Sequence, residues 1–253
     1  MKRSLGAGVI AAVLFCGSVA LAEEKKDEVD SFFDSLGSFS ATLTGTTDYV
    51  FRGISQTKEG PAVQGSFDWS KDFMAGKQKV GLFAGVWASN VDFADGDQAH
   101  IEIDYSGGIR TEVNGVSLEA LAIYYNYPNS RDSLDYDYIE AGGKVGYDFK
   151  VAEVSGTFLW SPDFFGGIGD AVYFAGDVSV PLPYKFAVGA HIGRSEFDNS
   201  GATDYTDWSI SISRPILGFD LSVAYFDTDL SKSECGGTEN CDARAVFTVS
   251  KSF

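Results

Sequence analysis

The last strand-like segment constrains the fold of this chain more than any other feature. Over residues 245–253, Ala245, Phe247, Val249 and Phe253 share one parity, so a β-strand there has one apolar face and ends on an aromatic ring. The closing strand of an outer-membrane β-barrel needs one face for lipid and the other for the lumen. We expect Phe247, Val249 and Phe253 to form the signal that the barrel assembly machinery recognises.

The start of the chain has the pattern of an export signal. It opens with the basic MKR, continues with a short apolar run over residues 5–15 and reaches a cleavage pattern at Ala20-Leu21-Ala22. The apolar run is shorter than the about 20 residues that a membrane-spanning helix needs. We therefore expect residues 1–22 to be a signal peptide that is removed on export to the outer membrane of a Gram-negative bacterium.

Residues 23–38 differ in character from the rest of the chain. They are acidic, and Val29, Phe32, Phe33 and Leu36 recur at helical spacing. The pattern fits a short amphipathic helix that partly fills the periplasmic mouth of a barrel. It fits an N-terminal tail equally well.

The composition favours strands and argues against a nucleic-acid partner. Asp and Glu number 36 against 19 Lys and Arg, a net charge of −17, whereas nucleic-acid binding rewards basic residues. Aromatic residues make up 14% of the chain and glycines number 29, against 6 prolines; this usage favours strands and turns. No stretch after the export signal contains 18 consecutive apolar residues, so any membrane span must be made of strands.

Strand-like alternation runs through residues 39–253, which we expect to form one all-β domain, an antiparallel transmembrane β-barrel of about 12 strands. Short turns at one end and longer loops at the other are typical of such barrels, with the short turns in the periplasm. The connections near 112–115, 149–151, 181–183 and 215–217 are short, and those near 128–135, 162–169, 196–203 and 229–241 are long. The expected strands are 39–51, 61–71, 79–91, 98–111, 116–127, 136–149, 151–161, 170–180, 184–195, 204–214, 218–228 and 242–253.

Two cysteines lie in the last long loop, which the even strand number places outside the cell. Cys235 and Cys241 are expected to form a disulfide, because exported proteins mature in an oxidising compartment. No His lies in this loop to suggest a metal site. We expect neither a metal nor a cofactor.

Parity assigns most side chains to a face. In the expected first strand, Tyr49 and Phe51 share the lipid parity of Leu43, while Asp48 and Arg52 share the lumen parity. In two segments both faces are apolar, so Phe83, Trp87, Ile123 and Tyr125 receive no face. Aromatic residues gather near strand ends on the lipid face, as interfacial girdles do: Tyr49, Phe51, Phe67, Trp69, Tyr105, Tyr147, Phe149, Trp160, Trp208, Phe219 and Tyr225.

Several motifs resemble the TorF porin family. The segments DYVFRGISQT at 48–57 and PAVQGSFD at 61–68 are similar to the family's opening signature. Further similarities are WASNVDF at 87–93, EIDYSGG at 102–108 and YYNYP at 124–128. Thr47 stands where the family pattern leads us to expect Ser, and the segment 235–241 is particular to this chain. The resemblance spans the chain after the export signal and implies an outer-membrane channel, without catalytic residues or a settled solute.

The lumen face carries more acids than bases, ten against five by parity. An open channel with this lining favours cations, because fixed negative charges repel anions along a narrow path. Alternatively, the charges pair across neighbouring strands and only keep the interior hydrated. Asp48 and Arg52 are the leading candidates for a selectivity pair, or for an ion pair that holds the first loop. The candidate pore-lining residues are Asp48, Arg52, Asp68, Glu102, Asp104, Arg110, Glu140, Lys144 and Asp207.

These patterns lead us to expect a porin-like channel, in contact with outer-membrane lipid, for passive diffusion of small polar solutes or cations. They leave the oligomeric state open. A plugged structural or adhesive barrel is the alternative. An outer-membrane enzyme is less expected, because it needs a nucleophile with a positioned base. The chain offers only His100 and His191, with no serine motif beside either, and each fits a hydrogen-bonded structural role better.

Overall fold

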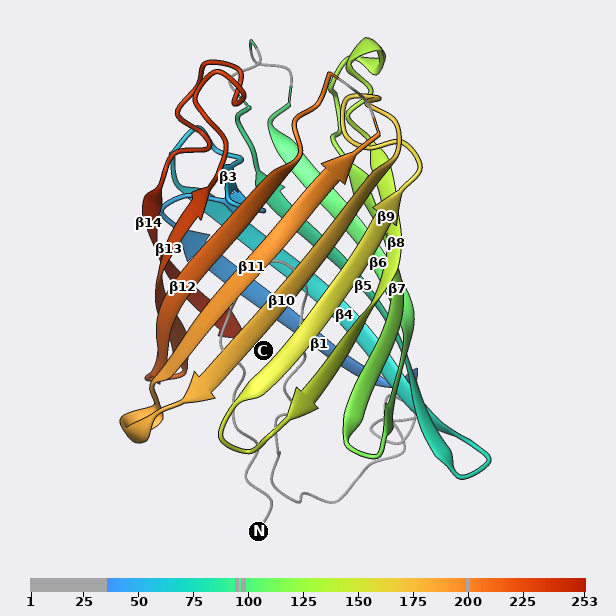
Figure 1. Ribbon diagram of the computed structural model, residues 1–253. Coiled ribbons are helices and arrows are strands. Elements are labelled where there is room, and N and C mark those ends of the chain that lie inside the picture. Colours follow the sequence, from blue (N-terminus) through green and yellow to red (C-terminus); the bar gives the residue numbers. More distant parts are fainter. Residues whose placement is uncertain (1–35, 94–95, 97–98, 199–200) are drawn as a thin grey trace.

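The structure, a computed structural model, describes residues 36–93, 96, 99–198 and 201–253, so the expected export signal and nearly all of segment 23–38 lie outside the described residues. Twelve strands close into one antiparallel barrel, with the last strand bonded to the first (Figure 1). The expected fold class and strand number are confirmed. The barrel strands are β1 Ser38–Thr46, β4 Ala62–Ala75, β5 Gln78–Asn90, β6 Ile101–Val113, β7 Val116–Asn126, β8 Tyr138–Asp148, β9 Glu153–Ser161, β10 Ala171–Pro181, β11 Ala187–Phe197, β12 Tyr205–Ile216, β13 Phe219–Thr228 and β14 Arg244–Ser252.

The connections differ between the two ends of the barrel, as the sequence predicted. Figure 1 shows short turns at one end and longer loops at the other. In the two-residue turns Asn114-Gly115 and Leu217-Gly218, both residues have positive φ, the conformation that best matches the twist of a hairpin. The regular elements outside the barrel wall are the short strands β2 Val50–Phe51 and β3 Ile54–Ser55, and the 3-10 turns η1 Asp132–Leu134 and η2 Pro183–Lys185.

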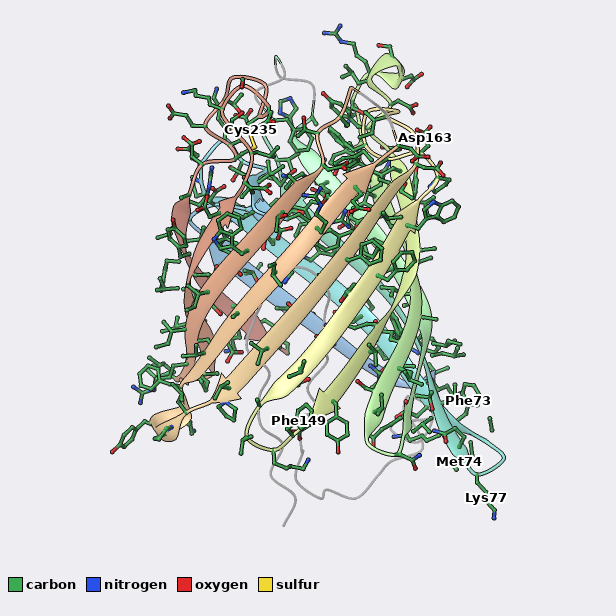
Figure 2. The ribbon with its side chains drawn as sticks, in the orientation of Figure 1. Phe73, Met74, Lys77, Phe149, Asp163 and Cys235 are labelled. Atoms are coloured by element: carbon green, nitrogen blue, oxygen red, sulfur yellow. A yellow bond between two sulfur atoms is a disulfide. The ribbon has the colours of Figure 1, made fainter. Side chains whose placement is uncertain are left out.

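The outer surface of the barrel wall is apolar. Leu43 is 56% exposed, and Phe67 and Ile210 are each 57% exposed, so the outward parity expected for these residues is confirmed. Figure 2 shows side chains projecting from the outer wall along its height. Because apolar side chains of this size are costly to hydrate, the surface suits a lipid environment. Within the described residues, no helix has the length and apolarity needed to cross a membrane.

The expected first strand is too long. β1 ends at Thr46, and residues 47–61 leave the sheet to form a loop that contains the β2–β3 hairpin. Tyr49 is only 7% exposed and therefore does not face lipid; Phe51, likewise assigned to the lipid face, packs against buried aromatic residues. Both assignments are wrong, because alternation continues through a segment whose backbone has already turned inward.

Strands β5 and β7 contain the two segments in which both faces are apolar. One apolar face of each points to the lumen. Ile123 and Tyr125 on β7 are 5% and 4% exposed. On β5, Trp87 packs its ring against Tyr49, with 5.2 Å between ring centroids. Part of the lumen is therefore an apolar and aromatic core rather than open space.

The apolar outer wall predicts that a charge is costly there and tolerated beyond it. Val223 lies in the middle of β13 and faces outward, whereas Val151 lies in the β8–β9 turn; they are 47% and 74% exposed. In lipid vesicles, Val223→Arg should lower the unfolding free energy by about 2–4 kcal/mol and Val151→Arg by less than about 1 kcal/mol. Denaturant titration of both variants measures this. Equal effects would contradict a lipid-facing wall.

Candidate functional site

The candidate site is the lumen near the end with the long loops, where residues 47–61 fold inward. We call these residues the inner loop. They leave β1, yet Arg52 at the hairpin tip contacts β8 and β10, which lie on the opposite side of the barrel from β1. Gly53 lies against Asp207 and Thr228 of β12 and β13, so closely that a Cβ atom would be 2.4 Å from the Thr228 methyl group. The inner loop therefore crosses the mouth of the lumen.

Arg52 anchors the tip of the inner loop. Its Nη2 donates to both carboxylate oxygens of Glu140 on β8, at 2.8 Å and 2.6 Å, and the two side chains are 6% and 1% exposed. The guanidinium lies 4.0 Å from the ring centroid of Tyr173 and 4.7 Å from that of Phe51. A buried ion pair is costly to break from one side, because the remaining charge has no solvent. The inner loop is thus held by charge at its farthest point.

Asp48 holds the base of the inner loop. It accepts hydrogen bonds from the hydroxyls of Ser55 and Thr57 at 2.7 Å and 2.8 Å, and from Nη1 of Arg244 on β14 at 2.8 Å. Asp48 and Arg52, expected to act as a pair, are therefore each bonded to a different partner. Both residues do hold the first loop, which was the other expectation. They do so through two separate ion pairs and not through one with each other.

Neighbouring loops cover the inner loop. The Ser55 N–H donates to the carbonyl of Asn240, and the Asp92 N–H donates to the carbonyl of Gln56, each at 2.8 Å. Asn240 belongs to the β13–β14 loop, in which Cys235 and Cys241 form the expected disulfide. In the same exposed loop, a hydrogen bond from the Lys232 ammonium group holds the pKa of Glu239 below its usual range. The disulfide-closed loop thus packs onto the segment that crosses the lumen.

Aromatic rings of the barrel wall face the inner loop. Tyr125 stacks on Tyr138 at 4.3 Å and lies edge-on to Phe51 at 6.0 Å, measured between ring centroids. The Tyr125 hydroxyl donates to Glu140 at 3.0 Å and so supports the acceptor of Arg52. We did not identify Tyr125, Tyr138 and Tyr173 as site residues from the sequence. The doubled apolar pattern of β7 was the only signal that pointed toward such a wall.

Three of the predicted lining charges lie elsewhere on the lumen face. Arg110 on β6 pairs in register with Glu119 on β7, which pairs in register with Lys144 on β8. The positions therefore alternate in charge across three strands, the arrangement that favours cross-strand pairing. Asp68 on β4 accepts a hydrogen bond from Ser66 at 2.9 Å. The lining thus combines charges placed side by side with others that have no register partner of opposite sign.

His191 on β11 is enclosed between two carboxylates. Its Nδ1 lies 2.7 Å from Asp177, and its Nε2 lies 3.0 Å from Asp207 and 3.0 Å from the Tyr173 hydroxyl. The expected structural role of His191 is confirmed, since both ring nitrogens have hydrogen-bond partners. Asp207, expected as a lining residue, is 2% exposed and belongs to this network.

Glu102 and Asp104, the remaining predicted lining residues, lie on the lumen face of β6 beside the inner loop. Glu102 is 2% exposed and accepts a hydrogen bond from the Tyr49 hydroxyl at 3.3 Å. One oxygen of each carboxyl group is buried without a hydrogen-bond partner. No other lumen-facing acids are left in this condition within the described ranges.

Three solved structures have a similar fold. The KdgM porin aligns with a TM-score of 0.51 and 10% sequence identity, over 85% of this chain and 99% of that one. The KdgM porin in complex with disordered oligogalacturonate aligns equally well, at 8% identity, over 85% and 99%. A structure described under in-meso crystallization of membrane proteins has a TM-score of 0.50 and 13% identity, over 85% and 83%. At these identities the likeness defines the fold alone: a closed antiparallel barrel of the porin class.

The family is defined by sequence. Residues 33–253 match the model of a family described as "Bacterial protein of unknown function (Gcw_chp)", and the chain belongs to this family. A search of curated proteins found no significant match. The family description assigns no activity, so function has to be argued from the site.

Because Arg52 and Glu140 form a buried pair, the single variant Arg52→Ala should lose more unfolding free energy than the double variant. Arg52→Ala leaves the Glu140 carboxylate buried without its cation and should lower the unfolding free energy by about 3–5 kcal/mol. Adding Glu140→Gln should restore part of that loss, because the neutral amide costs less to bury. Denaturant titration of the full cycle measures the coupling, with Lys77→Ala in an exposed turn as the control. Additive losses would show that the two side chains do not act as a pair.

Proposed function

We propose that this protein is an outer-membrane channel of the porin type, through which small polar solutes or cations diffuse passively. One observation carries the proposal: a single closed barrel has an apolar outer wall and a lumen lined by hydroxyl and charged groups. Away from the inner loop, the lumen face of four adjoining strands carries mainly small hydroxyl side chains, which suit water better than a packed core: Thr42, Thr44, Ser209, Ser211, Ser213, Ser222, Thr248 and Ser250.

Further support comes from resemblance. The motifs at 48–57 and 61–68 are similar to those of the TorF porin family, and the barrel has the fold of the KdgM porin. We place the protein in the outer membrane on the same grounds, with the export pattern of residues 1–22 in agreement. The mechanism needs no cofactor and no catalytic step, because transport follows the concentration gradient.

The inner loop defines the narrowest part of the proposed path. It crosses the lumen from β1 to β8 and β10 and is anchored by Arg52 and Asp48, so it limits what passes and how fast. The same observation favours a second candidate, a plugged structural or adhesive barrel in which the inner loop never leaves the lumen. The two candidates differ in whether the intact protein conducts ions.

Conductance of the refolded protein in a planar bilayer tests the proposal. We expect discrete conducting steps and, in a salt gradient, a cation-selective reversal potential, because acids outnumber bases in the lumen. Arg52→Ala should raise the unit conductance by releasing the tip of the inner loop, while Lys77→Ala should leave it unchanged. If neither the wild-type barrel nor Arg52→Ala conducts, the plugged barrel becomes the better description.

The ring of Phe253 is proposed to serve assembly rather than stability. Phe253 is 67% exposed, and its backbone exchanges two hydrogen bonds with Ala41, so Phe253→Ser removes the ring and keeps the backbone pair. We expect strongly reduced outer-membrane yield in cells but normal refolding in detergent, with Leu217→Ser, which removes an exposed apolar side chain in a turn, as the control. Normal yield of Phe253→Ser would refute the proposed signal.

A further inference from the structure

Glu102 and Asp104 are two acids in one confined position. They lie two residues apart on β6, so both point into the lumen, and their carboxyl groups are within hydrogen-bonding reach of each other. Glu102 is only 2% exposed, and its Oε2 has no hydrogen-bond partner. Asp104 Oδ1 is in the same condition. Two carboxyl groups in contact, one buried and one partly buried, disfavour double ionisation unless a positive species lies between them.

The basic side chains that reach this part of the lumen are committed to other acids. The Nη2 group of Arg52 donates hydrogen bonds to Glu140, and Nη1 of Arg244 donates one to Asp48. The positive species at Glu102 and Asp104 therefore has to be a proton or a cation from solution. A proton or a cation would each give the unpartnered oxygens a partner. Only a bound cation would make the pair a site for a transported ion.

The surroundings suit a cation. The Tyr49 and Tyr127 hydroxyls lie at Glu102, and Trp87 and Tyr125 are the register partners of Asp104 on the two neighbouring strands. Aromatic ring faces attract cations, most strongly where water is excluded. The position is also on the lumen face beside the inner loop, where the buried Glu102 offers a bound ion carboxylate oxygen in place of water.

We propose that Glu102 and Asp104 form a binding site for a monovalent cation, with K⁺ as the representative ion. This inference rests on the proposed channel function and names the class of ion that its narrowest part holds. A calcium ion takes six to eight oxygen ligands, and no cluster of three or more His, Cys, Asp or Glu ligands lies among the described residues. Few ligands give weak binding, which lets a conducted ion leave again.

Thermal unfolding of the refolded full-length barrel tests the site without any need for conduction. K⁺ replaces N-methylglucamine at constant ionic strength, so only the identity of the cation changes. The wild-type midpoint should rise with K⁺, since a ligand that binds only the folded state stabilises it. The double variant Glu102→Gln/Asp104→Asn should lose this dependence. The matched control is Asp148→Asn/Glu153→Gln, an exposed register pair of acids on β8 and β9 that should keep it.

Two results would overturn the site. One is an equal K⁺ dependence in the double variant, which would place the binding elsewhere. The other is a wild-type midpoint that ignores K⁺ but shifts with pH in a way that the double variant abolishes, which would show a shared proton. Tyr49, Tyr127 and Glu140 are the other titratable groups nearby.

A direct measurement covers the case in which the double variant does not fold. Crystals of the wild-type protein soaked in Rb⁺ should show anomalous density between the two carboxyl groups, and empty density there would reject the site. The channel and the site fail separately. A barrel that binds K⁺ but conducts nothing would reject the channel, and a conducting barrel without K⁺ binding would reject the site.

Discussion

The closure of the sheet between β1 and β14 is the constraint on which the rest of this structure depends. Lipid offers no partner for backbone N–H and C=O groups, so an open sheet edge is not tolerated inside a membrane. The seam pairs Thr42–Thr46 with residues 248–252, and two bonds between Ala41 and Phe253, at 2.9 Å and 3.3 Å, extend it to the last residue. Closure sends alternate side chains to opposite sides. The alternating sequence then gives an apolar outer wall and a lumen that is polar except around the buried aromatic cluster.

A second constraint acts inside the barrel, where charges have little water around them. Buried charges persist only with partners, and the lumen meets this condition by pairing acids with basic side chains of other segments. Arg52 meets Glu140, Asp48 meets Arg244, and His191 lies between Asp177 and Asp207. The first two of these contacts fix the inner loop across the mouth. In the proposed channel, this segment across the mouth sets the narrowest point of the path.

Much of the fold could be predicted because its signals are local. Alternation with a period of two, turn residues such as Asn114-Gly115, and the difference in connection length identified twelve strands and their two ends. The inner loop was missed for a physical reason. Tyr49 and Phe51 keep the parity of β1 although the backbone has left the sheet at Thr46, and parity reports only the direction of a side chain along a straight strand.

By itself the sequence determined that this chain is an antiparallel barrel, which residues face outward on most strands, and that Cys235 and Cys241 pair. These features depend on the spacing of residues that are close in the sequence, and this spacing is the same in any fold. Only the tertiary structure decided that Arg52 reaches Glu140, 88 residues away, and that Asp48 reaches Arg244, 196 residues away. Barrel closure brings such positions together, because it sets how strands far apart in the chain face each other across the lumen.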